Sequence, residues 1–355
     1  MSNITDVMTA NNRLPGINQI PEQEIARIQR ILLIQYKPFG DVLLNTGYIP
    51  TLRRHFPAAK IDFLVMRPYK TILEDNPWLD RLIIMEKKKK HSLAYYAERL
   101  RIMRLVRKEK YDVIADQLRG TGSAQITLFS GARYRLGWMQ KRWNWVYNYR
   151  VQRDNFRYYS RAKFDLLNPL GVAEEEHNIY YHIKPDSMRY IQSWIHKKRL
   201  ENENLVVISP ASPVSAKQWS PACFAQLADL ILSRTDFKVI LLWGPGEKQL
   251  SQLIASRMKH RPVIAPPTTF NQAGALLKRA AMYIGNDGGI NHLAVAMETP
   301  SIAVFGPISN PKKWVAWHKP QHFYLRDWEF KNRKDNTFNV TPEQVFKTFK
   351  EYFKL

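Results

Sequence analysis

The chain has 355 residues and carries 54 Lys and Arg against 31 Asp and Glu, a formal net charge of +23, and 45% of its residues are hydrophobic. This length suits two domains, and its one cysteine, Cys223, excludes a disulfide framework and a cysteine-based zinc site within the chain. Because it shows no apolar run of the ~18–20 residues that span a bilayer and no secretory leader, we expect a soluble cytoplasmic protein. Its charge indicates a polyanionic partner: nucleic acid, an anionic membrane surface or a phosphorylated substrate.

The first half of the chain alternates short apolar runs with helical patterns. Residues 1–28 are polar and aperiodic, and we interpret them as an N-terminal extension. Runs typical of buried parallel strands follow at 30–36, 60–66, 81–85 and 111–116, and helices are expected at 42–55 and about 93–109. This alternation predicts an α/β, Rossmann-like N-terminal domain over residues 29–184.

The same alternation restarts after a polar linker predicted at 185–204. Strands are expected at 205–209, 238–243, 282–285 and 301–305, and helices at 221–233, 247–258 and 289–297. These elements predict a second Rossmann-like domain over residues 205–330, which would bind ligand at the carboxyl ends of its strands, in a cleft between the domains. A last helix within 340–355 carries a helical stripe of apolar residues that needs a surface to pack on, and the N-terminal domain is the candidate.

The segment Gly285-Asn-Asp-Gly-Gly-Ile-Asn-His292 leaves a predicted strand and enters a predicted helix. The adjacent glycines Gly288 and Gly289 let an anion approach the backbone closely, and the N-terminus of a helix favours phosphate. Asp287 can accept hydrogen bonds from sugar hydroxyls, and His292 lies one turn into the helix. The alternative is an ordinary strand-to-helix turn capped by Asp287, and spacing alone does not decide between them.

A second polar position, Asp41, stands in Phe39-Gly-Asp41 at the first strand-to-helix turn. A carboxylate there can take a proton from an attacking hydroxyl, although a helix-capping Asp is the commoner use of such a residue. This turn lacks Gly-x-Gly-x-x-Gly, which argues against a dinucleotide oxidoreductase, and a P-loop is also missing.

Two further loops of the second domain carry polar groups at the same expected edge. The loop 209–221 brings Ser212 and Lys217, and the lysine could neutralise a diphosphate leaving group. The turn Trp243-Gly-Pro-Gly-Glu247 offers a carboxylate suited to a ribose diol. A solvated loop lysine and a plain turn are the ordinary alternatives.

Basic residues are dense in two stretches of the first domain. Residues 87–110 contain ten Lys and Arg and two Glu, and residues 131–161 mix eight Lys and Arg with nine aromatic residues. Such surfaces bind nucleic acid, a phosphorylated sugar acceptor or a lipid headgroup layer, although solvated helix faces and core aromatics account for many of these residues. The candidates for acceptor binding are Lys88, Lys89, Lys90, Arg119, Arg133 and Arg142.

Taken jointly, these pieces resemble the ADP-heptose:lipopolysaccharide heptosyltransferases, a group of glycosyltransferase family 9 with the GT-B fold. The resemblance covers roughly residues 30–320, and its matching pieces are 40–44, 52–57, 134–137, 217–221, 285–293 and 299–307. Within the family, the chain looks most like the later-acting enzymes that add a branching heptose to the inner core.

The resemblance implies an inverting, metal-independent transfer of heptose from ADP-heptose to a phosphorylated lipopolysaccharide core, without a cofactor, at the cytoplasmic face of the inner membrane. Asp41 matches the family's general base. The donor-binding matches are Lys217, Asp287, Gly288, Gly289 and His292, with Glu247 near the nucleoside. Gly288 stands where many members have Ser or Thr, and Ser212-Pro213 stands where a Thr pair is common, so two hydroxyl contacts to the donor are in doubt.

Two other functions fit parts of the same sequence. A glycosyltransferase of the same fold with another nucleotide sugar or acceptor would need the same loops. A nucleic-acid-binding protein would explain the charge alone but not the spacing of the polar loops. No Asp-x-Asp pair supports a metal-bound diphosphate.

Overall fold

The computed structural model describes residues 19–154, 156–175, 178–327 and 338–355, and its contacts divide them into two compact units. Unit 1 holds the described residues up to 70 with 76–154 and 160–175, and unit 2 holds 71–75, 156–159 and those from 178 onward. Most of the predicted extension, residues 1–18, lies outside the described residues. Of the remainder, Ile20 is buried and Glu22–Ile25 form the short helix α1.

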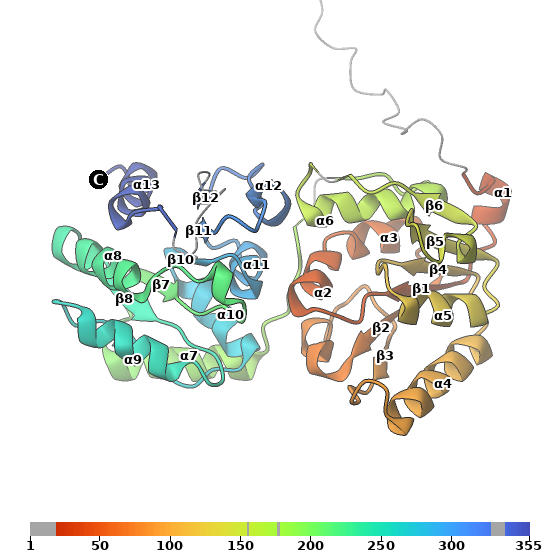
Figure 1. Ribbon diagram of the computed structural model, residues 1–355, viewed down its shortest axis with the longest axis horizontal. Helices are drawn as coiled ribbons and strands as arrows, with labels where there is room; N and C mark the ends of the chain where they lie inside the picture. The colour runs from red at the N-terminus through yellow and green to blue at the C-terminus, as the bar shows by residue number, and fades with distance from the viewer. Residues whose placement is uncertain (1–18, 155, 176–177, 328–337) are drawn as a thin grey trace, which may run out of the picture. The chain divides into compact units, whose positions relative to one another are not determined.

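Unit 1 is built on a sheet of six parallel strands in the order β3-β2-β1-β4-β5-β6 (Figure 1). The strands are β1 (Arg30–Ile34), β2 (Lys60–Met66), β3 (Arg81–Met85), β4 (Val113–Asp116), β5 (Tyr134–Trp138) and β6 (Tyr149–Val151). β1 at the centre is buried over residues 31–34, as its continuous apolar run requires in a sheet covered on both faces.

The helices of unit 1 lie on both faces of its sheet, because right-handed crossovers toward β3 and toward β6 place their helices on opposite sides. The connections comprise α2 (Phe39–Asn45), α3 (Ile49–His55), η1 (Arg67–Ile72), α4 (Leu93–Lys108), α5 (Thr121–Phe129), η2 (Asn144–Val146), α6 (Tyr159–Ala162) and η3 (Lys163–Leu170). The single helix predicted at 42–55 is two helices. Pro50 stands in the first turn of α3, where its missing N–H costs nothing, and it could not continue a helix from α2.

Unit 2 repeats the architecture with six parallel strands in the order β12-β11-β10-β7-β8-β9. They are β7 (Leu205–Ser209), β8 (Lys238–Leu241), β9 (Val263–Ile264), β10 (Met282–Asn286), β11 (Ser301–Phe305) and β12 (His322–Arg326). The helices are α7 (Pro185–Lys198), η4 (Ser215–Lys217), α8 (Pro221–Arg234), α9 (Lys248–Arg257), α10 (Phe270–Arg279), α11 (Gly289–Ala296), α12 (Pro311–Trp314) and α13 (Pro342–Phe353). The two sheets confirm the predicted α/β class with two Rossmann-like domains.

The stretch predicted as a linker, 185–204, is mostly the helix α7, which packs on α10 within unit 2. Pro185 opens it at a position that tolerates proline. Only Ser187, Ile191 and Ile195 are buried, so the helix presents a narrow inward stripe and an otherwise polar surface. Because most of its residues are polar, the segment was predicted to be a linker and not a helix.

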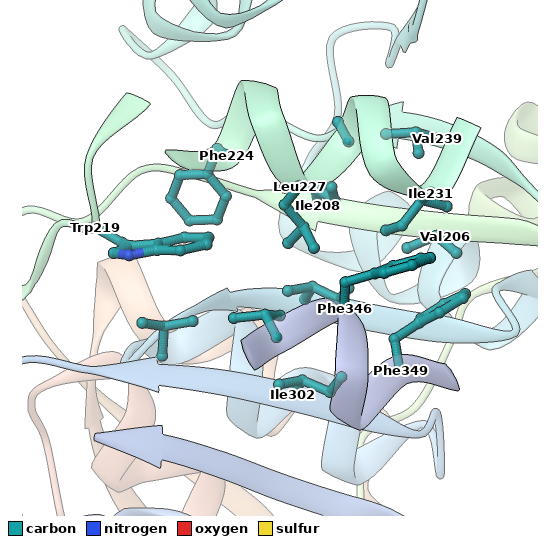
Figure 2. Packing of buried hydrophobic residues seen from close by; sticks show 14 of the residues in the cluster. Val206, Ile208, Trp219, Phe224, Leu227, Ile231, Val239, Ile302, Phe346 and Phe349 are labelled. Atoms are coloured by element: carbon teal, nitrogen blue, oxygen red, sulfur yellow. The ribbon is translucent and has the colours of Figure 1, made fainter. Parts of the chain in front are cut away.

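The C-terminal helix α13 packs on unit 2 and not on the N-terminal domain, so that part of the prediction was wrong. Its side chains Phe346 and Phe349 lie in one apolar cluster with Ile231 of α8 and Ile302 of β11 (Figure 2). The ring of Phe349 meets that of Phe237 edge-on at 5.1 Å between centroids. Helical periodicity shows that a face must be buried, but it carries no information on which surface covers it.

Candidate functional site

The winding of the sheet in unit 2 reverses between β7 and β10. From β7 the chain proceeds to β8 and β9 on one side, and from β10 it proceeds to β11 on the other. The loops that leave the carboxyl ends of these two neighbouring strands therefore diverge, and a doubly wound sheet binds its ligand at such a switch point. The loop after β7 carries Ser212 and Lys217, and the loop after β10 carries Asp287 and Gly288.

Lys217 and Asp287 form an ion pair at this point, with Nζ and Oδ2 2.6 Å apart. The Asp287 side chain is only 3% exposed, whereas that of Lys217 is 26% exposed. An ammonium group has three donors, and one of them is directed at Asp287. The remaining donors of a partly exposed cation can contact a ligand anion while the buried carboxylate holds the group in position.

Buried hydrogen bonds join the two loops behind this pair. The Asn286 side chain donates to the Pro210 carbonyl at 2.7 Å and accepts from the Trp219 N–H at 2.9 Å. The indole N–H of Trp219 in turn donates to the carbonyl of Val340, just before α13. These contacts make the Lys217 loop part of the scaffold, because moving it would leave several buried polar groups unsatisfied.

The helix α11 begins beside the ion pair with two glycines. Gly288 is its N-cap residue in an extended conformation, with φ −174°, and a Cβ added there would meet nothing within 4 Å. Its first N–H groups donate no hydrogen bond to the N-cap residue's side chain, since glycine has none. The positive end of α11 and the Lys217 ammonium therefore both favour an anion at this place.

The other three predicted donor residues are placed differently. Ser212 is buried and accepts from the Val214 N–H at 3.3 Å. Glu247 follows β8 and closes its own turn, because Oε2 accepts from the Gly244 N–H at 2.8 Å. His292 is buried in α11 with its ring centroid 6.0 Å from that of Trp314. The geometry thus brings together Lys217 and Asp287 with the glycines, and gives Ser212, Glu247 and His292 internal contacts.

In unit 1 the winding reverses between β1 and β4, and Asp41 follows the carboxyl end of β1 in the first turn of α2. The backbone there is fixed: Asn45 donates to the Asp41 carbonyl at 2.6 Å and accepts from the Tyr48 hydroxyl at 2.8 Å. The Asp41 side chain is partly exposed and its carboxylate accepts no hydrogen bond from the described residues. It is therefore available to a hydroxyl.

Two basic residues whose charges act together with that of Asp41, the buried Lys163 and the partly buried Arg153, were missed by sequence reasoning. The Lys163 side chain is fully buried, with Nζ 3.3 Å from Oε1 of Gln35. Burial lowers its pKa to about 7, the charge of Asp41 opposes this and that of Arg153 adds to it. Burial also lowers the pKa of Arg153 to about 10, again opposed by Asp41. No motif marks these residues, because their burial results from how η3 and the β6 region pack in three dimensions.

Five of the six predicted acceptor-binding residues lie at the same edge of the sheet in unit 1. Lys88, Lys89 and Lys90 follow the carboxyl end of β3, and all three are exposed. Arg119 and Arg142 follow β4 and β5, and both are exposed. Parallel strands place these loops at the edge where Asp41 lies.

Arg133 does not belong to this group. It directly precedes β5 and so lies at the amino ends of the strands, where it forms an ion pair with Glu24 of α1 at 2.6 Å. The prediction considered only its charge and its aromatic neighbours, and the start of β5 at Tyr134 decides its side of the sheet.

Within the described residues, no group of three or more His, Cys, Asp or Glu side chains is arranged to hold a metal ion. Among the helices of the same residues, none has the length and hydrophobicity needed to cross a membrane.

Comparison with known families identifies this scaffold. The model of glycosyltransferase family 9 (heptosyltransferase) matches residues 99–339. The chain belongs to this family. As a family 9 member it is a glycosyltransferase, and the loops after β4, β7 and β10 all fall within the matched range.

Relatives and solved structures agree with this assignment. The chain is 29% identical over 307 residues to lipopolysaccharide heptosyltransferase 3 of Escherichia coli, covering 81% of the chain and 86% of that protein. It is 23% identical to lipopolysaccharide heptosyltransferase 2 of Salmonella typhimurium, over 89% and 96% of the two. The family 9 glycosyltransferase structure from Veillonella parvula superposes with a TM-score of 0.80 at 21% identity, over 91% and 96%. The structure of E. coli heptosyltransferase WaaC with ADP-2-deoxy-2-fluoro heptose superposes with a TM-score of 0.68 at 19% sequence identity, covering 91% of this chain and 100% of that one. These superpositions show the shared GT-B fold.

Proposed function

We propose that this family 9 glycosyltransferase transfers a heptose from ADP-heptose to the phosphorylated inner core of lipopolysaccharide. The observation that carries the proposal is the Lys217–Asp287 pair beside the open N-terminus of α11, which supports binding of a diphosphate at this place without a metal. The names of the relatives support the sugar and the acceptor, and those named heptosyltransferase 3 favour a later heptose of the core.

In the proposed mechanism, Asp41 takes the proton of the acceptor hydroxyl as that oxygen attacks the anomeric carbon. The new glycosidic bond forms as the bond to ADP breaks, in a single displacement that inverts the anomeric configuration. Negative charge then develops on the departing diphosphate, where Lys217 and the N–H groups of Gly288 and Gly289 stabilise it. Asp287 orients Lys217 and accepts from the sugar hydroxyls, while the positive charge of Lys217 and of the α11 N-terminus takes the place of a divalent cation.

The remaining residues have supporting roles in this proposal. Ser212 and His292 shape the walls of the donor site, and Glu247 contacts the ribose through the oxygen that does not close its turn. The exposed cations after β3, β4 and β5 bind phosphates of the acceptor: Lys88, Lys89, Lys90, Arg119 and Arg142. Because such an acceptor is a lipid, the enzyme would work at the cytoplasmic face of the inner membrane as a peripheral protein.

The test is turnover of ADP-heptose with defined core acceptors, measured as ADP release and product mass, with and without a chelator. We expect product in both conditions, and nuclear magnetic resonance of the product should show an inverted anomeric carbon. Turnover of UDP-sugars without turnover of ADP-heptose would favour a different family 9 donor. Salt-sensitive binding of RNA or DNA that exceeds binding of truncated lipopolysaccharide would favour a nucleic-acid function.

A further inference from the structure

Helix α4 of unit 1 exposes a row of large apolar side chains to solvent. Leu93 is 87% exposed, Tyr96 54% and Leu100 44%. Their spacing of three and four residues places them on one side of the first two turns. The opposite side of the helix already packs against the protein, because Ile102 and Val106 are buried in a hydrophobic core cluster of unit 1.

Cations surround this row along the chain. Lys87–Lys90 precede the helix and are all exposed, and Arg104, Arg107 and Lys108 are exposed in its last two turns. Between residues 87 and 108 the single carboxylate is that of Glu98, which is buried and bonded to Arg101 at 2.7 Å. The outer face of α4 is therefore apolar and cationic, with no exposed negative charge.

The combination of exposed apolar residues and cations on α4 favours one kind of binding partner over others. Scattered exposed apolar residues are normal on proteins, but a contiguous row on a helix with flanking Lys and Arg is the pattern of helices that lie in a membrane interface. Nucleic acid would use the cations and the ring of Tyr96 but gains nothing from Leu93 and Leu100, the other two members of the row, which offer no ring for bases to stack on. A second copy of the same face would bring like charges together.

We propose that the α4 surface, defined by Leu93, Tyr96 and Leu100 with the exposed cations Arg104, Arg107 and Lys108, binds the surface of an anionic phospholipid bilayer. The apolar side chains enter the headgroup layer while the lysines and arginines contact lipid phosphates. This deepens the proposed function and rests on it for its purpose, since an acceptor anchored in lipid would be met at that surface. The binding itself involves no sugar transfer.

The test is sedimentation of the full chain with vesicles of phosphatidylcholine containing 30 mol% phosphatidylglycerol. We expect binding that weakens with salt and is far weaker to pure phosphatidylcholine. The double variant Leu93→Gln, Leu100→Gln should lower the partition coefficient by about 10-fold. Arg104→Gln with Lys108→Gln should lower it by roughly 10-fold or more, because each cation near the surface contributes separately.

Matched controls come from unit 2. Leu253→Gln removes a comparably exposed leucine of α9, and Lys197→Gln with Lys198→Gln removes a cation pair from the last turn of α7. Both should bind vesicles as the unaltered chain does. Equal binding by the Leu93, Leu100 variant, or RNA binding that depends on the same cations without any vesicle binding, would overturn the proposal.

Turnover of a water-soluble truncated acceptor separates this proposal from the proposed function. The α4 variants should keep that turnover while losing vesicle binding. If the chain binds vesicles but turns over no ADP-heptose, the membrane-binding proposal stands and the proposed heptosyl transfer is rejected.

Discussion

The sheets of the two units wind in the same pattern, but the charged groups at their switch points differ: within the described residues, those of unit 2 are paired, and that of unit 1 is not. At the switch point of unit 2, the charged groups Lys217 and Asp287 are paired, and buried hydrogen bonds of Asn286 and Trp219 hold their loops. At the switch point of unit 1, Asp41 presents a carboxylate that accepts no hydrogen bond from the described residues, and it interacts electrostatically with the buried Lys163 and the partly buried Arg153.

This difference fits the two chemical tasks of the proposed mechanism. A leaving diphosphate is stabilised by donors that are already in place when charge develops, so pre-formed contacts are an advantage there. A general base must accept a proton from the substrate itself, so its hydrogen-bonding capacity has to stay free until the substrate arrives. The comparison therefore predicts that substitutions in unit 1 and unit 2 affect different steps.

The largest effect is expected for Asp41→Asn. Turnover should fall by about 10²–10⁴-fold because the amide cannot take the proton, while ADP affinity measured by calorimetry should not change. Asp186→Asn is the matched control, since Asp186 also lies in the first turn of a helix but is 87% exposed on α7. Full turnover by the Asp41 variant would remove the functional contrast between the units.

Lys217→Gln should act on the donor step. We expect a loss of about 10²–10³-fold in turnover together with weaker ADP binding, which Asp41→Asn does not show. The variant also leaves the buried Asp287 carboxylate without its cation, so adding Asp287→Asn should restore part of the lost stability. Lys238→Gln is the control, because its partner Glu203 lies 3.8 Å away and both side chains are well exposed. Turnover near that of the unaltered chain would show that the α11 backbone alone holds the phosphates.

The positions of the polar residues in unit 2 were predicted more fully than those in unit 1. The strand-to-helix turns of unit 2 carry glycines and polar residues at a predictable edge of the sheet, so Lys217, Asp287 and Gly288 were expected to lie together, as they do. Asp41 was placed at the first turn of unit 1 for the same reason, and the chemical roles of all four residues stay predictions. Lys163 was missed and Arg133 was misplaced, because burial of a lysine and the side of a sheet on which an arginine lies depend on packing between distant segments.

The fold, like the site, was predicted well where the local sequence decides the structure and less well where distant segments pack together. Strongly apolar strands such as β1 and β7 and capped helices such as α8 were predicted close to their observed bounds. The polar helix α7 was predicted as a linker and α13 was assigned to the wrong unit. Both errors arise because a short apolar stripe shows that a helix buries something without showing what covers it.

The pH dependence of stability should also differ between the units. Burial lowers the pKa of His322 to about 4, with Lys319 and His318 adding to this. Between pH 4 and the ordinary value of about 6.5, the unfolded chain binds a proton that folded unit 2 does not, so acidification through this window costs up to about 3 kcal/mol. His322→Asn should remove this loss, as measured by denaturant unfolding at pH 7 and pH 4.

Unit 1 contains a buried group with the opposite response. Burial raises the pKa of Asp116 to about 7, although the Tyr147 hydroxyl bonded to it at 2.6 Å opposes the shift. Between the ordinary value near 4 and pH 7, the folded unit holds a proton that the unfolded chain has lost, so acidification stabilises unit 1. Asp116→Asn should remove that gain without changing the acid response of unit 2, and a shared response would contradict the assignment of each group to its own unit.

The smallest effect concerns the way unit 2 holds its ligand. Gly288→Ser should fold normally, because the backbone at this N-cap is extended and a Cβ there meets nothing within 4 Å. If its hydroxyl adds a contact to the donor phosphate, ADP affinity should rise by about 3- to 10-fold, the effect of one net hydrogen bond. Gly246→Ser is the control, since its Cβ also meets nothing but its φ of +82° is unfavourable for serine, so it should cost about 1–2 kcal/mol of stability without raising ADP affinity. A 10-fold loss of affinity in the Gly288 variant would mean that the phosphate occupies the space a side chain needs, and would locate the donor contact on the backbone of α11.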